Sequence, residues 1–114
     1  MSEKDPSIYI EHILSNIEQI ETFSENLDKE ELADNKLKQY AIIRAIEIIG
    51  EARNLPSNVK NNHPEVSWKE IIGTRDMMIH HYFGVDLNIV WNIIKIDLPI
   101  LKIQIIKIKS ELKH

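Results

Sequence analysis

The C-terminal quarter of the chain is apolar on more sides than one helix face can account for. Residues 87–108 contain neither Gly nor polar turn signals, so we expect one long helix capped by Asp86, although β-branched residues would also allow strands. A helix that is apolar on most sides must be covered on most sides. In a chain of 114 residues, that cover most naturally includes a second chain. Pro99 should kink this helix, because its ring displaces a backbone hydrogen bond. The large apolar residues are Leu87, Ile89, Val90, Trp91, Ile93, Ile94, Ile96, Leu98, Ile100, Leu101, Ile103, Ile105, Ile106 and Ile108.

The first half of the chain also has helical periodicity. Asp5 and Pro6 predict the start of a helix over about residues 6–25, as a cap and a preset first residue. Its apolar stripe consists of Ile10, Ile13, Ile17, Ile20 and Phe23. The acidic stretch 28–34 has room for a single helical turn. Asn35 caps a helix that should run to about Asn54, because Pro56 prevents its continuation.

The second half contains a polar connector and two further helices. The stretch 56–64 reads as the connector. Ser67 and Glu70 match a capping box, which predicts a helix from Trp68 to about Phe83, ended by Gly84. We therefore expect a single all-α domain over residues 1–114, an antiparallel bundle of four main helices that forms a homodimer.

Composition limits the possible functions. The chain has no Cys, which excludes disulfides, thiolate zinc sites and a Cys nucleophile, and only three Gly, so no Gly-rich nucleotide loop is expected. We expect a cytoplasmic protein, because neither a signal pattern nor a membrane-length apolar run is found. The net charge of −4 is uneven: residues 1–34 carry −8, residues 35–86 carry +1 and residues 87–114 carry +3. A locally positive surface therefore remains compatible with the sequence.

The strongest candidate for chemistry is the set Arg75, His80 and Tyr82. A guanidinium can bind phosphate, an imidazole can transfer protons near neutral pH, and a phenol can orient a substrate or accept a modification. Arg75 and Tyr82 are two helical turns apart, whereas His80 lies about 140° round the helix from Arg75. A distorted last turn, a swung Arg side chain or a dimer cleft could bring them together, and we favour the cleft. His81 is an alternative proton carrier.

This motif and several other segments resemble the HepT toxins of the HEPN superfamily. The matching segments are Arg75-Asp76-x-x-x-His80-x-Tyr82, residues 83–87 (FGVDL), 43–52 (IRAIEIIGEA), 63–68 (HPEVSW), 90–91 (VW) and 97–101 (DLPIL). The resemblance implies a dimeric helical bundle and a metal-independent ribonuclease toxin. It also implies a cognate antitoxin of the minimal nucleotidyltransferase (MNT) type that adds AMP to the motif tyrosine. By position, Arg75 and His80 would be catalytic and Tyr82 would accept AMP.

Other polar residues have weaker claims. Glu47 and Glu51 are four apart beside Arg44, and form either a solvated acid pair with a local ion pair or a support for Arg75 or His80. Asp76 and His81 are further possible supporting residues of the motif. The histidines and acids lack metal-ligand spacing on the expected helices, so we expect no metal and no cofactor. Trp68 and Trp91 are expected in the core or an interface. The rival function is a catalytically silent binding partner of a nucleotidyltransferase.

Overall fold

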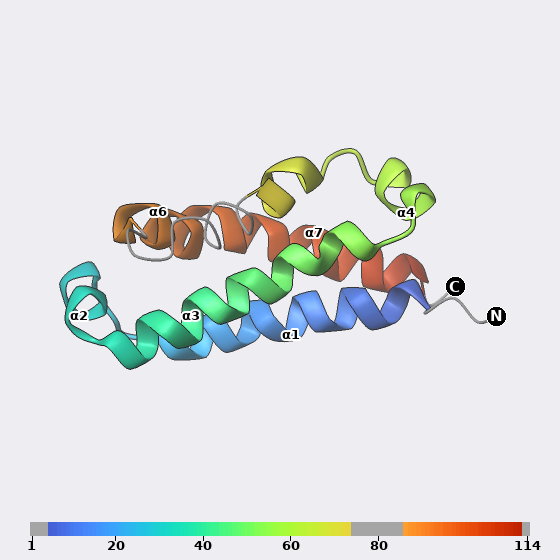
Figure 1. The fold of residues 1–114 in the computed structure, drawn as a ribbon. Coiled ribbons are helices and arrows are strands. Elements are labelled where there is room, and N and C mark those ends of the chain that lie inside the picture. Colours follow the sequence, from blue (N-terminus) through green and yellow to red (C-terminus); the bar gives the residue numbers. More distant parts are fainter. Residues whose placement is uncertain (1–4, 74–85, 113–114) are drawn as a thin grey trace.

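The computed structural model describes residues 5–73 and 86–112, and within these residues the fold is all-α, without strands. Three long helices lie side by side: α1 (Pro6–Ser24), α3 (Lys36–Ile49) and α7 (Leu98–Leu112) (Figure 1). Two ion pairs, Lys102–Glu21 at 2.8 Å and Lys109–Glu11 at 3.1 Å, connect α7 to α1. Because the partner number falls as the α7 number rises, these two helices are antiparallel. The expected all-α class is confirmed.

The helix starts follow the capping residues in the sequence. The Asp5 side chain accepts a hydrogen bond from the Ser7 amide at 2.9 Å at the start of α1. The short helix α2 (Lys29–Asp34) begins with a complete capping box between Asp28 and Glu31. Asn35 accepts from the Lys38 amide at 3.0 Å and begins α3. These starts were predictable because each depends on residues no more than three positions apart.

Two details between α3 and the next helix differ from expectation. The α-helix expected to reach Asn54 ends at Ile49, and the 3₁₀ helix η1 (Gly50–Asn54) completes it before Leu55 becomes extended. The stretch expected as a connector contains the short helix α4 (Ser57–Asn62), which starts directly after Pro56. A helix end often tightens into 3₁₀ form, and proline is compatible with a helix start although not with an interior.

The last helix begins as expected and contains one irregular turn. Asp86 accepts a hydrogen bond from the Asn88 amide at 2.8 Å and caps α6 (Leu87–Asn92). A π-helical segment, η2 (Ile93–Asp97), joins α6 to α7, and the Leu98 amide donates to the Ile93 carbonyl five residues earlier. The disturbance expected at Pro99 therefore takes the form of a wider turn immediately before the proline.

The core lies where α1, α3 and the α6–α7 helix meet. Ile10, Ile17, Ile42, Ile105 and Ile108 are completely buried. All residues of the expected α1 stripe are buried except Phe23, which is partly buried and packs against the core. The outer face of the last helix remains uncovered in the single chain. Its exposed isoleucines are Ile96 (54%), Ile100 (56%), Ile103 (72%) and Ile106 (48%).

Within residues 5–73 and 86–112, no helix is long and apolar enough to cross a lipid bilayer.

Candidate functional site

The described structure borders the sequence motif on both sides. A helix covers residues 68–73, and the description resumes at Asp86, the cap of α6. The motif and supporting residues Arg75, Asp76, His80, His81 and Tyr82 lie outside the described residues. Their mutual geometry therefore stays a prediction. What the structure does show is how the fold holds the segment that leads into the motif.

A short loop, residues 63–67, sets the start of the helix over 68–73. The Trp68 indole N–H donates to the His63 carbonyl at 3.0 Å, and the Val66 amide donates to the same carbonyl at 3.2 Å. The Ile71 amide then donates to the Ser67 carbonyl at 3.0 Å, which is an i to i−4 helical bond. Trp68 is 9% exposed, so it is a core residue as expected. Its ring anchors the loop from inside the fold.

Polar side chains of α7 hold the same loop from outside. The Gln104 side-chain amide donates to the Glu65 carbonyl at 2.9 Å. The His63 ring lies between two carboxylates, with Nδ1 3.5 Å from Glu65 and Nε2 3.2 Å from Glu111. A backbone hydrogen bond at Glu65, followed by the nearby His63 and Lys107, lowers the pKa of Glu65. We call these five residues, His63, Glu65, Gln104, Lys107 and Glu111, the loop–α7 seam.

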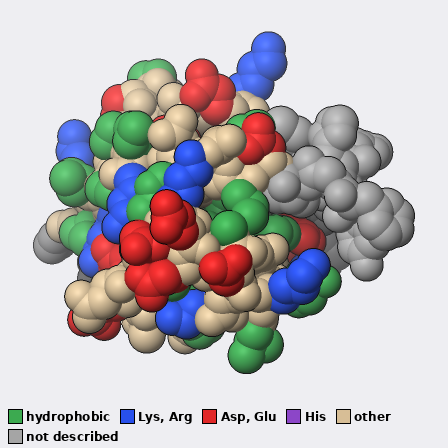
Figure 2. Space-filling model, turned by 90° about the vertical axis from the view of Figure 1, so that its left-hand side faces the viewer, with side chains coloured by type: hydrophobic (Ala, Val, Ile, Leu, Met, Phe, Trp, Pro, Cys, Tyr) green, Lys and Arg blue, Asp and Glu red, His purple; other side chains and the backbone are tan. Residues whose placement is uncertain are grey.

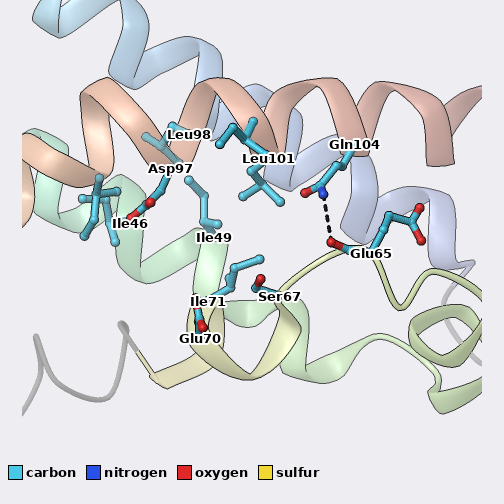
Figure 3. A pocket seen from close by; sticks show the side chains of 12 residues that line it. Ile46, Ile49, Glu65, Ser67, Glu70, Ile71, Asp97, Leu98, Leu101 and Gln104 are labelled. Atoms are coloured by element: carbon cyan, nitrogen blue, oxygen red, sulfur yellow. Dashed lines mark hydrogen bonds between the residues drawn. The ribbon is translucent and has the colours of Figure 1, made fainter.

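A cavity of about 260 Å³ lies beside the seam, between α3, the helix over 68–73 and the last helix (Figure 3). Apolar and polar side chains alternate round its walls, with Asp97 beside Ile46 and with Glu65 and Gln104 at the other end (Figure 3). The apolar lining residues are Ile46, Ile49, Ile71, Ile93, Leu98, Ile100 and Leu101, and the polar ones are Glu65, Ser67, Glu70, Asp97 and Gln104. Partial burial, and secondarily the charge of Glu70, raise the pKa of Asp97. Three carboxylates repel a phosphate group. This cavity is therefore unsuited to the RNA backbone.

The surface of the described residues offers no broad cationic area on the face drawn in Figure 2. Lys and Arg side chains alternate there with Asp, Glu and hydrophobic side chains. Long-range attraction of a polyanion needs a concentration of one sign of charge. On this face, the described residues do not supply it.

Glu47 and Glu51 lie on α3 and η1. Arg44 contacts Glu47 at 3.6 Å, with the Arg44 side chain 68% exposed, which is the local ion pair expected from the sequence. The alternative role, support of Arg75 or His80, concerns residues outside the described part and stays a prediction. Trp91 is partly buried, and the Lys95 ammonium lies 4.8 Å from its ring centre. In the described part of the chain, no group of three or more His, Asp and Glu residues could hold a metal ion.

Sequence reasoning did not identify the loop–α7 seam. His63 and Glu65 are neighbours in sequence, and that pair alone could have been noticed. The other contacts join His63 to Glu111 and Glu65 to Gln104, more than 35 positions away. No local periodicity reports contacts at such separations, so only the folded chain reveals them.

Comparison with known proteins places this fold in a family. Residues 13–108 match the family described as Ribonuclease HepT-like. The chain is 46% identical over 95 residues to "Probable ribonuclease HepT" of Thermococcus cleftensis, covering 82% of this chain and 86% of that protein. It is 38% identical over 115 residues to "Putative RNase MJ0125" of Methanocaldococcus jannaschii, covering 100% and 99%.

A further relative in Methanocaldococcus jannaschii is longer. "Gamma-glutamylcyclotransferase and putative RNase MJ0434" is 44% identical over 110 residues, which are 96% of this chain and 50% of that protein. The chain thus spans half the length of this relative. No solved structure shows significant similarity to the chain. Because the family match covers most of the helical bundle and the whole stretch from Arg75 to Tyr82, the chain belongs to the HepT-like ribonuclease family.

Proposed function

We propose that the protein is a metal-independent RNA endonuclease, the toxin of a HepT–MNT toxin–antitoxin pair, with Arg75 and His80 as its catalytic residues. The observation that carries the proposal is the family match over residues 13–108, which encloses the Arg-x4-His-x-Tyr motif. The relatives' names add support, since they describe ribonucleases. The acidic cavity argues that phosphate is bound outside it, which is compatible with a site at Arg75.

The proposed chemistry uses the nucleophile that RNA carries itself. A neutral His80 removes the proton of the 2′-hydroxyl, whose oxygen attacks the adjacent phosphorus as the bond to the 5′-oxygen breaks. An imidazolium, from the same residue or from the second copy, returns a proton to the leaving oxygen. The Arg75 guanidinium binds two phosphate oxygens and stabilises the charge that develops on them. This reaction needs no metal ion, and Asp76, His81, Glu47 and Glu51 remain candidates for orienting the pair.

We further propose that two copies form the active unit. The uncovered outer face of the last helix supports this part of the proposal. Ile96, Ile100, Ile103 and Ile106 follow one another at steps of four, three and three, and each is about half exposed or more. A symmetric dimer would bury the same apolar stripe on both copies. It would also give the motif a second chain against which a cleft can form.

Regulation would act on Tyr82. In the proposed reaction, the Tyr82 hydroxyl oxygen attacks the α-phosphorus of ATP in the antitoxin, pyrophosphate leaves, and the hydroxyl proton is released. The resulting phosphodiester adds about one negative charge beside Arg75, which repels substrate phosphate. Tyr82→Phe should therefore escape modification while retaining the ring. Intact mass after incubation with the partner and ATP should show AMP increments on the wild type and none on Tyr82→Phe.

The direct test is RNA cleavage by the purified protein. Arg75→Ala and His80→Ala should each abolish cleavage without unfolding the chain, and EDTA should have no effect. Arg44→Ala is the matched control, because the Arg44 side chain is 68% exposed and, among the described residues, pairs with Glu47 at the surface. Cleavage that survives Arg75→Ala but stops with EDTA would refute the mechanism. If His81→Ala is more damaging than His80→Ala, the proton carrier is His81.

The alternative function is a catalytically silent helical partner of the nucleotidyltransferase. It would predict AMP addition to Tyr82 and no RNA cleavage under any condition. The ribonuclease names of the relatives favour the enzyme.

A further inference from the structure

The side chains that α7 directs at the loop form one polar face. Lys107 and Glu111 follow Gln104 by three and seven positions, which places all three on the same side of the helix over two turns. Gln104 binds the Glu65 carbonyl, Lys107 attracts the Glu65 carboxylate, and Glu111 contacts the His63 ring. Gln104 contacts Glu65 and the later Glu111 contacts the earlier His63, so the loop runs antiparallel to the helix along this face.

His63 is the member of the seam whose contacts depend on its protonation. Its side chain is only 12% exposed, and both ring nitrogens face carboxylates. A neutral imidazole carries one N–H and one lone pair, so it can attract only one of two carboxylates and repels the other. An imidazolium presents an N–H at both nitrogens. The observed arrangement, 3.5 Å to Glu65 and 3.2 Å to Glu111, is therefore fully satisfied only when His63 is protonated.

The backbone of His63 connects this charge to the helix over residues 68–73. Its carbonyl accepts from the Trp68 indole and from the Val66 amide, directly before the helix over residues 68–73. We propose that His63 is a positioning residue: its imidazolium ties the loop to α7 and so fixes the direction of the helix over residues 68–73, which precedes the Arg75–Tyr82 motif in sequence. The consequence for catalysis rests on the proposed ribonuclease function, whereas the placement of the helix does not.

Charged groups on each packed element bear on this arrangement. Glu65 lies on the loop itself, and Glu111 and Lys107 come from α7. From α4, the Lys60 carbonyl accepts a hydrogen bond from the His63 amide. The Lys60 ammonium donates a hydrogen bond to the Arg53 carbonyl at 3.3 Å. The two carboxylates closest to the ring thus favour a cation at position 63, and Lys107 also attracts Glu65.

Trp68 provides a reporter that does not require enzyme activity. The chain has only two Trp, so Trp91→Phe leaves Trp68 as the sole indole, hydrogen-bonded to the His63 carbonyl. In this parent, Trp68 emission should differ in one step between acid and alkaline solution, because only a protonated His63 ring can attract both Glu65 and Glu111. His63→Gln, which cannot be charged, should remove the step. His63→Arg, which is always charged, should hold the emission at its acid-side value throughout.

His12→Gln is the matched control, since His12 is an exposed histidine on α1 and not a member of the seam. It should leave the step unchanged. Glu111→Gln should make the emission change smaller, because the cation loses one of its two carboxylate partners. A flat signal in the Trp91→Phe parent, or an unchanged step in His63→Gln, would overturn the proposal. So would a step that disappears in His12→Gln.

Cleavage kinetics give the second readout. Displacing a catalytic group by about 1 Å can cost on the order of a hundredfold in rate, so His63→Gln should lower kcat by roughly tenfold to a hundredfold with little change in KM. His63→Arg should restore most of kcat at neutral pH. A kcat unchanged in His63→Gln would overturn the positioning role. A wild type that never cleaves RNA refutes the proposed function instead, and the Trp68 titration then decides the placement of the helix alone.

Discussion

Replacing Ile103 by Glu should separate the proposed dimer into monomers. Burying an isoleucine fully is worth about 1.5–3 kcal/mol, and Ile103 is 72% exposed in the single chain, so an interface can gain about 1–2 kcal/mol from each copy. A two-fold interface contains this residue twice, which makes about 2–4 kcal/mol, or a roughly 30- to 900-fold weaker Kd. Glu is a good helix former and lies four residues before Lys107, so the helix itself should be preserved.

Sedimentation velocity over a range of concentrations measures this dissociation directly. Leu37→Glu is the matched control, because Leu37 is 79% exposed and belongs to the outer side of α3 rather than the α7 stripe. It should leave both the dimer and the melting temperature nearly unchanged. Three results would refute the reasoning: a wild type that is monomeric at tens of micromolar, an Ile103→Glu dimer of undiminished affinity, or a larger effect of Leu37→Glu.

Two further predictions concern stability. Ile105→Ala should lower the free energy of unfolding by about 2–5 kcal/mol, measured by urea denaturation, because Ile105 is completely buried between α7 and the core. Asp97→Asn should raise the melting temperature at neutral pH. Burial, and then the charge of Glu70, raise the pKa of Asp97, so the charged carboxylate stabilises the folded state less than the protonated form does. The stability that the protonated Asp97 contributes is present below the ordinary Asp pKa of 3.8 and is lost as the pH rises through the higher pKa of Asp97 in the folded state. Asp97→Asn should therefore gain most above this range, and an equal gain at acid pH would contradict the assignment.

The parts of the fold that sequence reasoning predicted are those determined by neighbouring residues. Asp5, Asn35 and Asp86 each cap the helix that follows them, and each bond spans two or three positions. The apolar stripe of α1 is likewise a local pattern, and its isoleucines are buried as expected. The 3₁₀ end of α3 and the helix α4 were missed. Both depend on small energy differences between α, 3₁₀ and extended backbone in a polar stretch, which packing decides.

The candidate site likewise has a part that neighbouring residues predict and a part that only the folded chain reveals. The types and spacing of Arg75, His80 and Tyr82 predict a chemistry, and the family match supports it, but their mutual placement lies outside the described residues. The contacts that hold the entry to this motif were not predictable, since they join the loop to residues of α7 far along the chain. Composition could not indicate them either, because Gln104 and Glu111 read as ordinary solvated positions of a helix.

The carboxylates near this loop also limit where the surface could attract an RNA. Beside the helix over residues 68–73, the described fold places Glu65, Glu70 and Asp97 along one cavity. These three carboxylates repel an anionic substrate from this side. Under the proposed function, the attraction would therefore come from the Arg75 segment and from a second copy of the chain. In the proposed enzyme the seam would matter for cleavage, because its contacts with Gln104 and Glu111 of α7 hold the loop before the helix over residues 68–73, which precedes Arg75 in sequence.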